Sequence, residues 1–138
     1  MTPGFVMDAS VAAAWCFPEA STPAIDALLD RMEAESAVVP AGWYLEVTHL
    51  LAVAERKGRL TPAQVAGFIA LVEDLQLHVD DQAPGRAFTQ ILSLCRAHRL
   101  SSRDAVYLDL ALRRQLPLAS LNDELRSAAK AVGVEVIG

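Results

Sequence analysis

Cysteine, aromatic residues and long apolar runs are all scarce in this chain. The two cysteines, Cys16 and Cys95, form no Cys-x-x-Cys pair, so neither a disulfide framework nor a cysteine-based metal site is expected. Both lie in apolar helical patterns, and we expect them to be buried free thiols. Aromatic residues make up 6% of the chain, which argues against RNA binding dominated by base stacking.

No apolar run approaches the ~20 residues that a membrane helix needs. The N-terminus also lacks the basic start of a signal peptide, so we expect a cytoplasmic protein with no membrane segment. Apolar residues at 53% and charged residues at 21% are typical of a folded globular protein. The length of 138 residues predicts one domain that spans residues 1–138.

The charge of the chain is unevenly distributed. The formal net charge of -5 argues against a general nucleic-acid coat, because phosphate affinity depends on basic side chains. Residues 1–84 hold 4 basic and 12 acidic side chains, whereas residues 85–138 hold 8 basic and 5 acidic ones. The C-terminal part could therefore face an anion.

Short β-branched runs alternate with longer helical patterns, which is typical of βαβ units around a parallel sheet. We therefore predict an α/β fold with a mostly parallel sheet of about five strands, at residues 5–7, 37–39, 77–79, 118–120 and 134–137. The helix caps are expected at Thr22, Thr61, Ser101 or Ser102, and Asn122 or Asp123. The inward helical faces are expected to be Trp43, Val47, Leu50, Leu51 and Ala54; Val65, Phe68, Ile69 and Val72; Phe88, Ile91, Leu92 and Cys95; and Tyr107, Leu108, Ala111 and Leu112.

Three acidic residues lie at positions where the sequence pattern does not indicate an exposed surface charge. Asp8 follows the first predicted strand, Glu46 leans inward from a helix, and Asp104 lies in the first turn of another helix. Each one alone also fits a structural role. Asp8 could form an Asx-turn, Glu46 could pair with an arginine, and Asp104 could complement the helix dipole.

Together these acids and their flanking segments resemble a known family. The segments Met7–Ala12 (MDASVA), Leu45–Val47 (LEV), Leu100–Ala111 (LSSRDAVYLDLA) and Leu116–Asn122 (LPLASLN) are similar to the four motif regions of PIN-domain proteins, specifically VapC-type toxins. The resemblance covers essentially the whole chain. It implies a PIN-like three-layer α/β/α fold and a Mg²⁺- or Mn²⁺-dependent endoribonuclease that is neutralised by a VapB-like antitoxin and forms a homodimer.

The resemblance also implies the roles of individual residues. Asp8, Glu46 and Asp104 match the catalytic, metal-binding acids, and Ser10 and Ser120 match hydroxyl positions near them. The fourth motif departs from the family pattern Thr-x-Asp, because Asn122 stands where an aspartate is usual and Asp123 follows it. An amide is a poorer ligand for a hard cation than a carboxylate, so either Asn122 or Asp123 could complete the metal site.

Converging carboxylates repel one another unless a cation joins them, and that cation can drive hydrolysis of a phosphodiester bond. Attack by the 2′-hydroxyl of RNA is not expected, because His49, His78 and His98 all fit structural or surface positions. The substrate phosphates are expected to meet Arg96, Arg99 and Arg103, although a solvated helix end explains these arginines equally well. Arg113 and Arg114 are expected to complement the C-terminal end of their helix.

Bulky apolar residues in the early helices suggest either a core or a partner surface. This group comprises Trp15, Phe17, Trp43, Tyr44, Leu50 and Leu51.

Two other functions remain open. Asn122 is compatible with a catalytically weakened PIN domain that serves as an RNA- or protein-binding module. A receiver-like phosphoacceptor domain is the lesser alternative. Such a domain needs a lysine after a late strand, and the only lysines, Lys57 and Lys130, lie in helical patterns.

Overall fold

The fold is built on a five-stranded sheet in which every neighbouring pair of strands is parallel. A computed structural model describes residues 2–138, apart from the side chain of Pro18. The strand order is β3-β2-β1-β4-β5. The predicted strands are confirmed with small shifts at their ends: β1 is Pro3–Met7, β2 Ser36–Pro40, β3 Leu77–Asp80, β4 Leu118–Ala119 and β5 Val136–Ile137.

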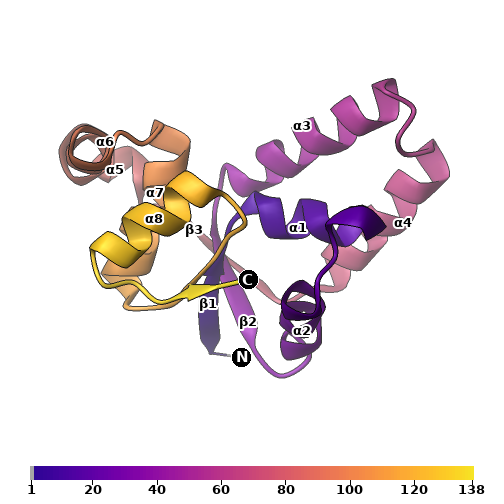
Figure 1. The fold of residues 1–138 in the computed structure, drawn as a ribbon, viewed down its shortest axis with the longest axis horizontal. Helices are drawn as coiled ribbons and strands as arrows, with labels where there is room; N and C mark the ends of the chain where they lie inside the picture. The colour runs from indigo at the N-terminus through magenta and orange to yellow at the C-terminus, as the bar shows by residue number, and fades with distance from the viewer. Residues whose placement is uncertain (1) are drawn as a thin grey trace.

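Helices cover both faces of the sheet, which makes the predicted three layers. Figure 1 shows α1–α4 on one side of the sheet and α5–α8 on the other. No helix of residues 2–138 is long and apolar enough to cross a membrane. The helices are α1 (Ala9–Cys16), α2 (Pro23–Arg31), α3 (Trp43–Arg56), α4 (Pro62–Asp74), α5 (Ala83–Arg86), α6 (Leu92–His98), α7 (Ser102–Arg114) and α8 (Asp123–Ala131), with a 3₁₀ turn η1 (Pro18–Ala20) and a π-helical turn η2 (Ala87–Ile91).

The strand order creates a switch point at the middle of the sheet. From β1 the chain proceeds outward to β2 and β3, and then it crosses back to add β4 on the other side of β1. In open parallel sheets, ligands bind outside the carboxyl ends of the strands at such a point. Asp8 follows β1 and Ser120 follows β4, so both stand at this crevice.

The central strands are buried because helices pack on both of their faces. Phe5, Val6 and Met7 of β1 are inaccessible to solvent, as is the apolar centre of β2. This rigid centre fixes the position of Asp8, the residue that follows β1. Cys16 and Cys95 are free thiols, as predicted, but each is only half-buried. Burial nevertheless raises the pKa of the Cys16 thiol to about 12.

The predicted helical face around Phe88 is partly wrong. The helix is divided into α5, the π-helical turn η2 and α6, and the wider turn rotates Phe88 outward, where it is 90% exposed. Ile91 is buried as predicted. Three other residues expected to face inward, Leu50, Ile69 and Leu112, are also partly exposed.

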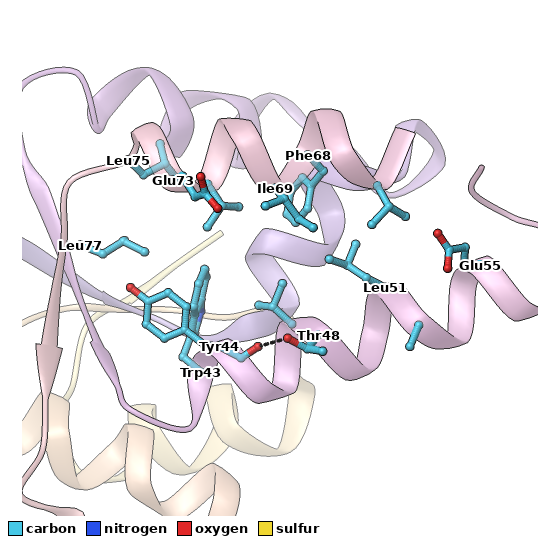
Figure 2. Close-up of a pocket in the computed structure, with 14 residues that line it drawn as sticks. Trp43, Tyr44, Thr48, Leu51, Glu55, Phe68, Ile69, Glu73, Leu75 and Leu77 are labelled. Atoms are coloured by element: carbon cyan, nitrogen blue, oxygen red, sulfur yellow. Dashed lines mark hydrogen bonds between the residues drawn. The ribbon is translucent and has the colours of Figure 1, made fainter. Parts of the chain in front are cut away.

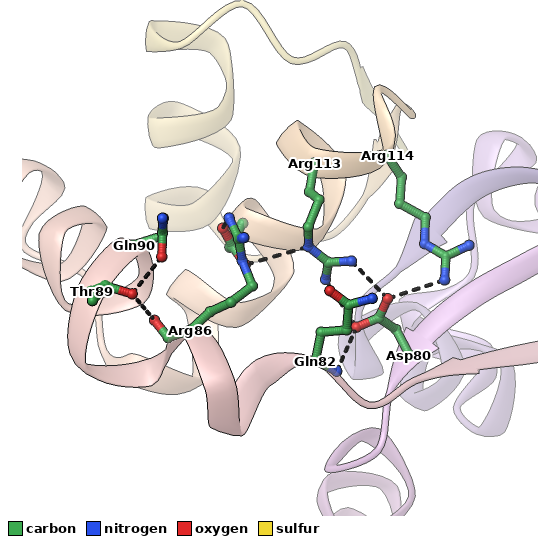
Figure 3. Close-up of polar contacts among 8 residues, drawn as sticks. Asp80, Gln82, Arg86, Thr89, Gln90, Arg113 and Arg114 are labelled. Carbon is green, nitrogen blue, oxygen red and sulfur yellow. Dashed lines mark hydrogen bonds and ion pairs between the residues drawn. The ribbon is translucent and has the colours of Figure 1, made fainter.

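An ion-pair network ties α7 to β3 and α5, as Figure 3 shows. Arg113 donates two hydrogen bonds to Asp80, each of 2.9 Å, and Arg114 adds a third of 3.1 Å. Asp109 accepts two hydrogen bonds of 2.8 Å from Arg86. The hydrogen bonds from Arg113 are the main reason why the pKa of Asp80 falls to about 2. The basic end of α7, predicted to complement the helix dipole, therefore also anchors the end of β3.

Candidate active site

Asp8 is held at the end of β1 by hydrogen bonds to both oxygens of its carboxylate. It is the N-cap of α1, where Oδ1 accepts from the backbone N–H of Ser10, and its Oδ2 accepts from the hydroxyl of Ser120. The carboxylate is buried. Asp8 therefore does form the turn expected of an isolated aspartate, and it does so inside the predicted site.

The two predicted serines link the turn after β1 to the turn after β4. The Ser10 hydroxyl accepts a hydrogen bond of 2.9 Å from the backbone N–H of Leu121. The Ser120 hydroxyl donates to Asp8 and accepts 3.0 Å from the backbone N–H of Asn122. These contacts fix the relative positions of Asp8 and Asn122, which are far apart in sequence.

Glu46 lies in the first turn of α3, beside Asp8 and Asp104. Its Oε2 accepts a hydrogen bond of 2.6 Å from the hydroxyl of Tyr107, and its Oε1 lies 3.5 Å from Nε of Arg103. Arg103 is 66% exposed, whereas the Glu46 side chain is only 19% exposed. Partial burial is the main cause that raises the pKa of Glu46, against the lowering effect of Tyr107 and Arg103.

Asp104 lies in the first turn of α7. Of the two caps predicted for this helix, Ser101 is the one observed. The Ser101 hydroxyl accepts a hydrogen bond of 3.1 Å from the backbone N–H of Asp104. The Asp104 Oδ2 accepts 3.2 Å from Nδ2 of Asn122. Burial raises the pKa of Asp104, and the nearby negative charge of Asp8 raises it further.

Asn122 uses the two ends of its amide for different purposes. Its Oδ1 caps α8 by accepting from the backbone N–H groups of Glu124, at 3.0 Å, and Leu125, at 3.3 Å. Its Nδ2 faces Asp104. Of the two expected caps, Asn122 is therefore the one observed. The amide oxygen, which is the only atom of this side chain able to bind a cation, is already engaged.

The three acids line one pocket of about 370 Å³, together with Ser10 and Asn122. Asp8 comes from the turn between β1 and α1, Glu46 from α3 and Asp104 from α7, which are distant parts of the sequence. The repulsion among them is visible in Glu46 and Asp104, whose pKa values are raised in part by the charge of Asp8. Such a group of carboxylates favours binding of protons or of a cation.

The donor chemistry of this pocket fits a hard divalent cation, since Mg²⁺ and Mn²⁺ prefer carboxylate oxygens. The arrangement is not a finished ligand cage. Within residues 2–138, no three His, Cys, Asp or Glu side chains stand close enough to form a metal-binding group. Each of the three acids instead accepts at least one hydrogen bond from a protein donor. Binding of a cation would require Asp8, Asp104 and Oε1 of Glu46 to come closer to a common centre.

Other predicted residues fall inside or outside this pocket. Asp123 is exposed and lines a different hollow, with His98 and Arg99. Arg96 is exposed, and the pocket lining includes Arg103 but neither Arg96 nor Arg99. His49, which was expected to have a structural or surface role, is exposed on the lining of the acidic pocket.

Tyr107 was missed as a site residue, because its spacing placed it on the apolar face of α7. It is buried as that pattern predicted, yet its hydroxyl contacts Glu46. The available signal was its position three residues after Asp104, which puts both residues on one side of the helix.

A separate apolar groove of about 630 Å³ lies between α3 and α4. Figure 2 shows Tyr44, Leu51, Phe68 and Ile69 directed into it, with Glu55 and Glu73 at its border. The early apolar residues thus divide between core and surface. Trp43 and Leu51 are buried, whereas Tyr44 and Leu50 are partly exposed.

These features describe a parallel α/β domain with an acidic pocket at the switch point of its sheet. The sequence profile of the PIN domain matches residues 5–131, and the chain belongs to the PIN domain family. Proteins of this family are generally nucleases that bind RNA and use divalent metal ions. The family match excludes the receiver alternative, and so does the strand order, which in receiver domains is 2-1-3-4-5.

Among solved structures, the chain is similar to the crystal structure of PAE2754 from Pyrobaculum aerophilum. The TM-score is 0.71 at 19% sequence identity, and the alignment covers 99% of this chain and 92% of that chain. At this identity the similarity supports the fold alone. No curated protein matches the sequence.

Proposed function

We propose that this chain is a Mg²⁺- or Mn²⁺-dependent endoribonuclease of the VapC type. The observation that carries the proposal is the convergence of Asp8, Glu46 and Asp104 on one pocket at the switch point of a PIN fold. A structural role explains each acid alone. It does not explain why three half-buried or buried carboxylates from separate parts of the fold line one pocket.

In this mechanism Asp8, Glu46 and Asp104 hold the cation. The cation, when bound, supplies an activated water and stabilises the charge that develops on the phosphate and on the leaving oxygen. Ser10 and Ser120 keep the Asp8 carboxylate in place through the hydrogen bonds described above. Because Asp8 directly follows the buried residues Phe5–Met7 of β1, it forms the fixed side of the site.

Asn122 acts as a hydrogen-bond donor to Asp104 in this proposal and does not bind the cation. Its Nδ2 lies where an aspartate would place a second negative oxygen, 3.2 Å from Asp104 Oδ2. The site therefore has three acids instead of four. This difference motivates the second candidate function, a catalytically weakened PIN domain that binds RNA or protein. That alternative predicts no cleavage, and its RNA-binding form predicts binding of metal and RNA.

Substrate phosphates are proposed to contact the exposed arginines near the start of α7. Arg103 lines the acidic pocket, and Arg96 and Arg99 precede it on α6 and the connecting turn. Arg103 lies 3.5 Å from Glu46 and 66% of its side chain is exposed, so it can turn toward a phosphate. Contacts of this kind position RNA without reading its sequence.

Two protein partners follow from the resemblance to VapC-type toxins: a VapB-like antitoxin and a second copy of the chain. The apolar groove between α3 and α4 supports an antitoxin site, because an amphipathic helix could bury its apolar face there. The acidic groups of Glu55 and Glu73 at the border of the groove favour basic residues on that helix.

The test is cleavage of a mixed pool of structured RNA by purified, antitoxin-free protein. Cleavage is expected with Mn²⁺ and not with EDTA, and Asp104→Asn should reduce the rate by at least ~100-fold if the cation supplies the catalysis. The matched control is Asp74→Asn, an exposed aspartate at the end of α4. Cleavage in EDTA would refute the mechanism. Metal-dependent RNA binding without cleavage would favour the binding module.

A further inference from the structure

A buried tyrosine hydroxyl contacts Glu46, one of the acids of the pocket. Tyr107 is 1% exposed, and its hydroxyl donates a hydrogen bond of 2.6 Å to Oε2 of Glu46. Burial, reinforced by Glu46, raises the pKa of the phenol, so the hydroxyl keeps its proton and remains a donor. A buried hydroxyl with one charged acceptor makes a stronger and more directional contact than an ordinary surface hydrogen bond.

The position of Tyr107 relates it to all three acids. It lies three residues after Asp104, so α7 presents both side chains on the same side. The backbone N–H of Ala9, the residue after Asp8, also lies near the Tyr107 hydroxyl and lowers the pKa of Tyr107. One hydroxyl on α7 thus lies near the first residue of α1, which follows Asp8, and contacts Glu46 in the first turn of α3.

Glu46 is the acid that most needs such a contact. Its side chain has one more rotatable bond than an aspartate, and its other partner, Arg103, is mostly exposed and 3.5 Å away. The contact with Tyr107 fixes Oε2 and leaves Oε1 as the oxygen that can exchange Arg103 for a cation. Without the hydroxyl, the carboxylate can rotate toward solvent with Arg103.

We propose that Tyr107 is a positioning residue that holds Glu46 for binding of the divalent cation. This role rests on the proposed metal-dependent nuclease and assigns one of its residues. Groups that orient a metal ligand through a hydrogen bond commonly change metal affinity ~10–100-fold when they are removed. The hydroxyl does not touch the substrate or the cation itself.

The test is Tyr107→Phe, which removes only the hydroxyl, with Tyr44→Phe as the matched control. Tyr44 lies on α3 and lines the apolar groove, so the same substitution can be made there outside the acidic pocket. Mn²⁺ affinity is measured without RNA, by electron paramagnetic resonance of the free ion, and folding is checked by circular dichroism in EDTA. Tyr107→Phe should bind Mn²⁺ ~10-fold more weakly, as expected for an orienting group. Tyr44→Phe should match wild type.

A second variant approaches the same contact from Glu46. Glu46→Asp withdraws the carboxylate from the hydroxyl, so it should weaken Mn²⁺ binding, and adding Tyr107→Phe should cause no further loss. Additive losses would show that Tyr107 acts elsewhere and would overturn the proposal, as would a Mn²⁺ affinity of Tyr107→Phe within twofold of wild type.

RNA cleavage separates this role from the proposed function. The cleavage rate of Tyr107→Phe should approach wild type at saturating Mn²⁺ and fall at low Mn²⁺, because the defect lies in holding the ion. A wild-type protein that binds Mn²⁺ and cuts no RNA would refute the nuclease. Equal Mn²⁺ affinity of wild type and Tyr107→Phe would refute the positioning role.

Discussion

The substitution Asn122→Asp restores the usual aspartate of the family motif, and the structure predicts that it destabilises the metal-free protein. It replaces the Nδ2 donor, 3.2 Å from Asp104 Oδ2, with a carboxylate oxygen. Two unit charges at this separation repel by about 5 kcal/mol at an effective dielectric constant of ~20. Protonation limits that cost, because holding one carboxyl protonated at pH 7 requires about 4 kcal/mol.

Side-chain rotation relieves part of this repulsion, so we expect a loss of about 2–4 kcal/mol in the free energy of unfolding at pH 7. The helix cap itself should be unaffected, since aspartate and asparagine cap equally well. The repulsion raises the folded-state pKa of one carboxyl above its unfolded value. The loss should therefore grow as the pH rises through that pKa and shrink below about pH 4.

Urea unfolding followed by circular dichroism in EDTA measures this loss, and a repeat with Mn²⁺ measures its reversal. Mn²⁺ should stabilise Asn122→Asp more than wild type, because the added carboxylate becomes a ligand. Asn122→Ser is the control, since serine keeps the cap without adding a charge. If Asn122→Asp is as stable as wild type in EDTA, Asn122 does not face Asp104 as described.

Three further predictions concern other parts of the molecule. Asp80→Asn should lower the free energy of unfolding at pH 7 by about 2 kcal/mol, because the ordinary carboxyl pKa of 3.8 is lowered to about 2 in the folded protein. In urea titrations this difference from wild type should disappear as the pH falls toward 2. The exposed Asp81 provides the control, since Asp81→Asn should leave the free energy of unfolding unchanged. Stabilisation of wild type by Mn²⁺ should be smaller at pH 5 than at pH 7 in thermal unfolding, because the raised pKa values of Glu46 and Asp104 let protons compete with the ion. Arg99→Ala should weaken RNA binding for all sequences alike and reduce the slope of log affinity against log salt by about 0.7, as measured by filter binding.

The sheet could be predicted from the sequence because its strands are short, apolar and bounded by helical patterns. Phe5–Met7 of β1 and Ala37–Val39 of β2 are buried, because helices cover both faces of the sheet. A strand buried on both faces is a short apolar run, and such a run can be recognised in the sequence. Helix caps were also predictable, since Thr22, Thr61 and Ser101 all accept the hydrogen bonds that their positions indicated. Local chemistry sets these features.

Phe88 could not be placed correctly from periodicity. The helical rule assumes 3.6 residues per turn, and the π-helical turn η2 breaks that rule. The partners of Asp80 were equally inaccessible, because Arg113 and Arg114 reach it from more than thirty residues away along the chain. Only the crossing of α7 over the sheet brings them together.

The three acids of the candidate site were predictable as a set, because the flanking segments resemble PIN motifs. Their hydrogen bonds were not. Tyr107 looked apolar because it is buried, and periodicity does not distinguish a buried side chain from one that carries a buried hydroxyl. The orientation of the Asn122 amide depends on Asp104, which only the fold brings near.

In the proposed function, Asp8, Glu46 and Asp104 form one cation-dependent site that hydrolyses RNA. Cleavage of RNA with Mn²⁺ in ¹⁸O-labelled water, followed by mass spectrometry of the product ends, tests it most directly. Linear products are expected that carry one labelled oxygen in the new terminal phosphate, and Asp8→Asn should cut no RNA. Unlabelled 2′,3′-cyclic phosphate ends would contradict it and would direct attention to His49, which lines the same pocket. Full cleavage by Asp8→Asn would contradict it as well.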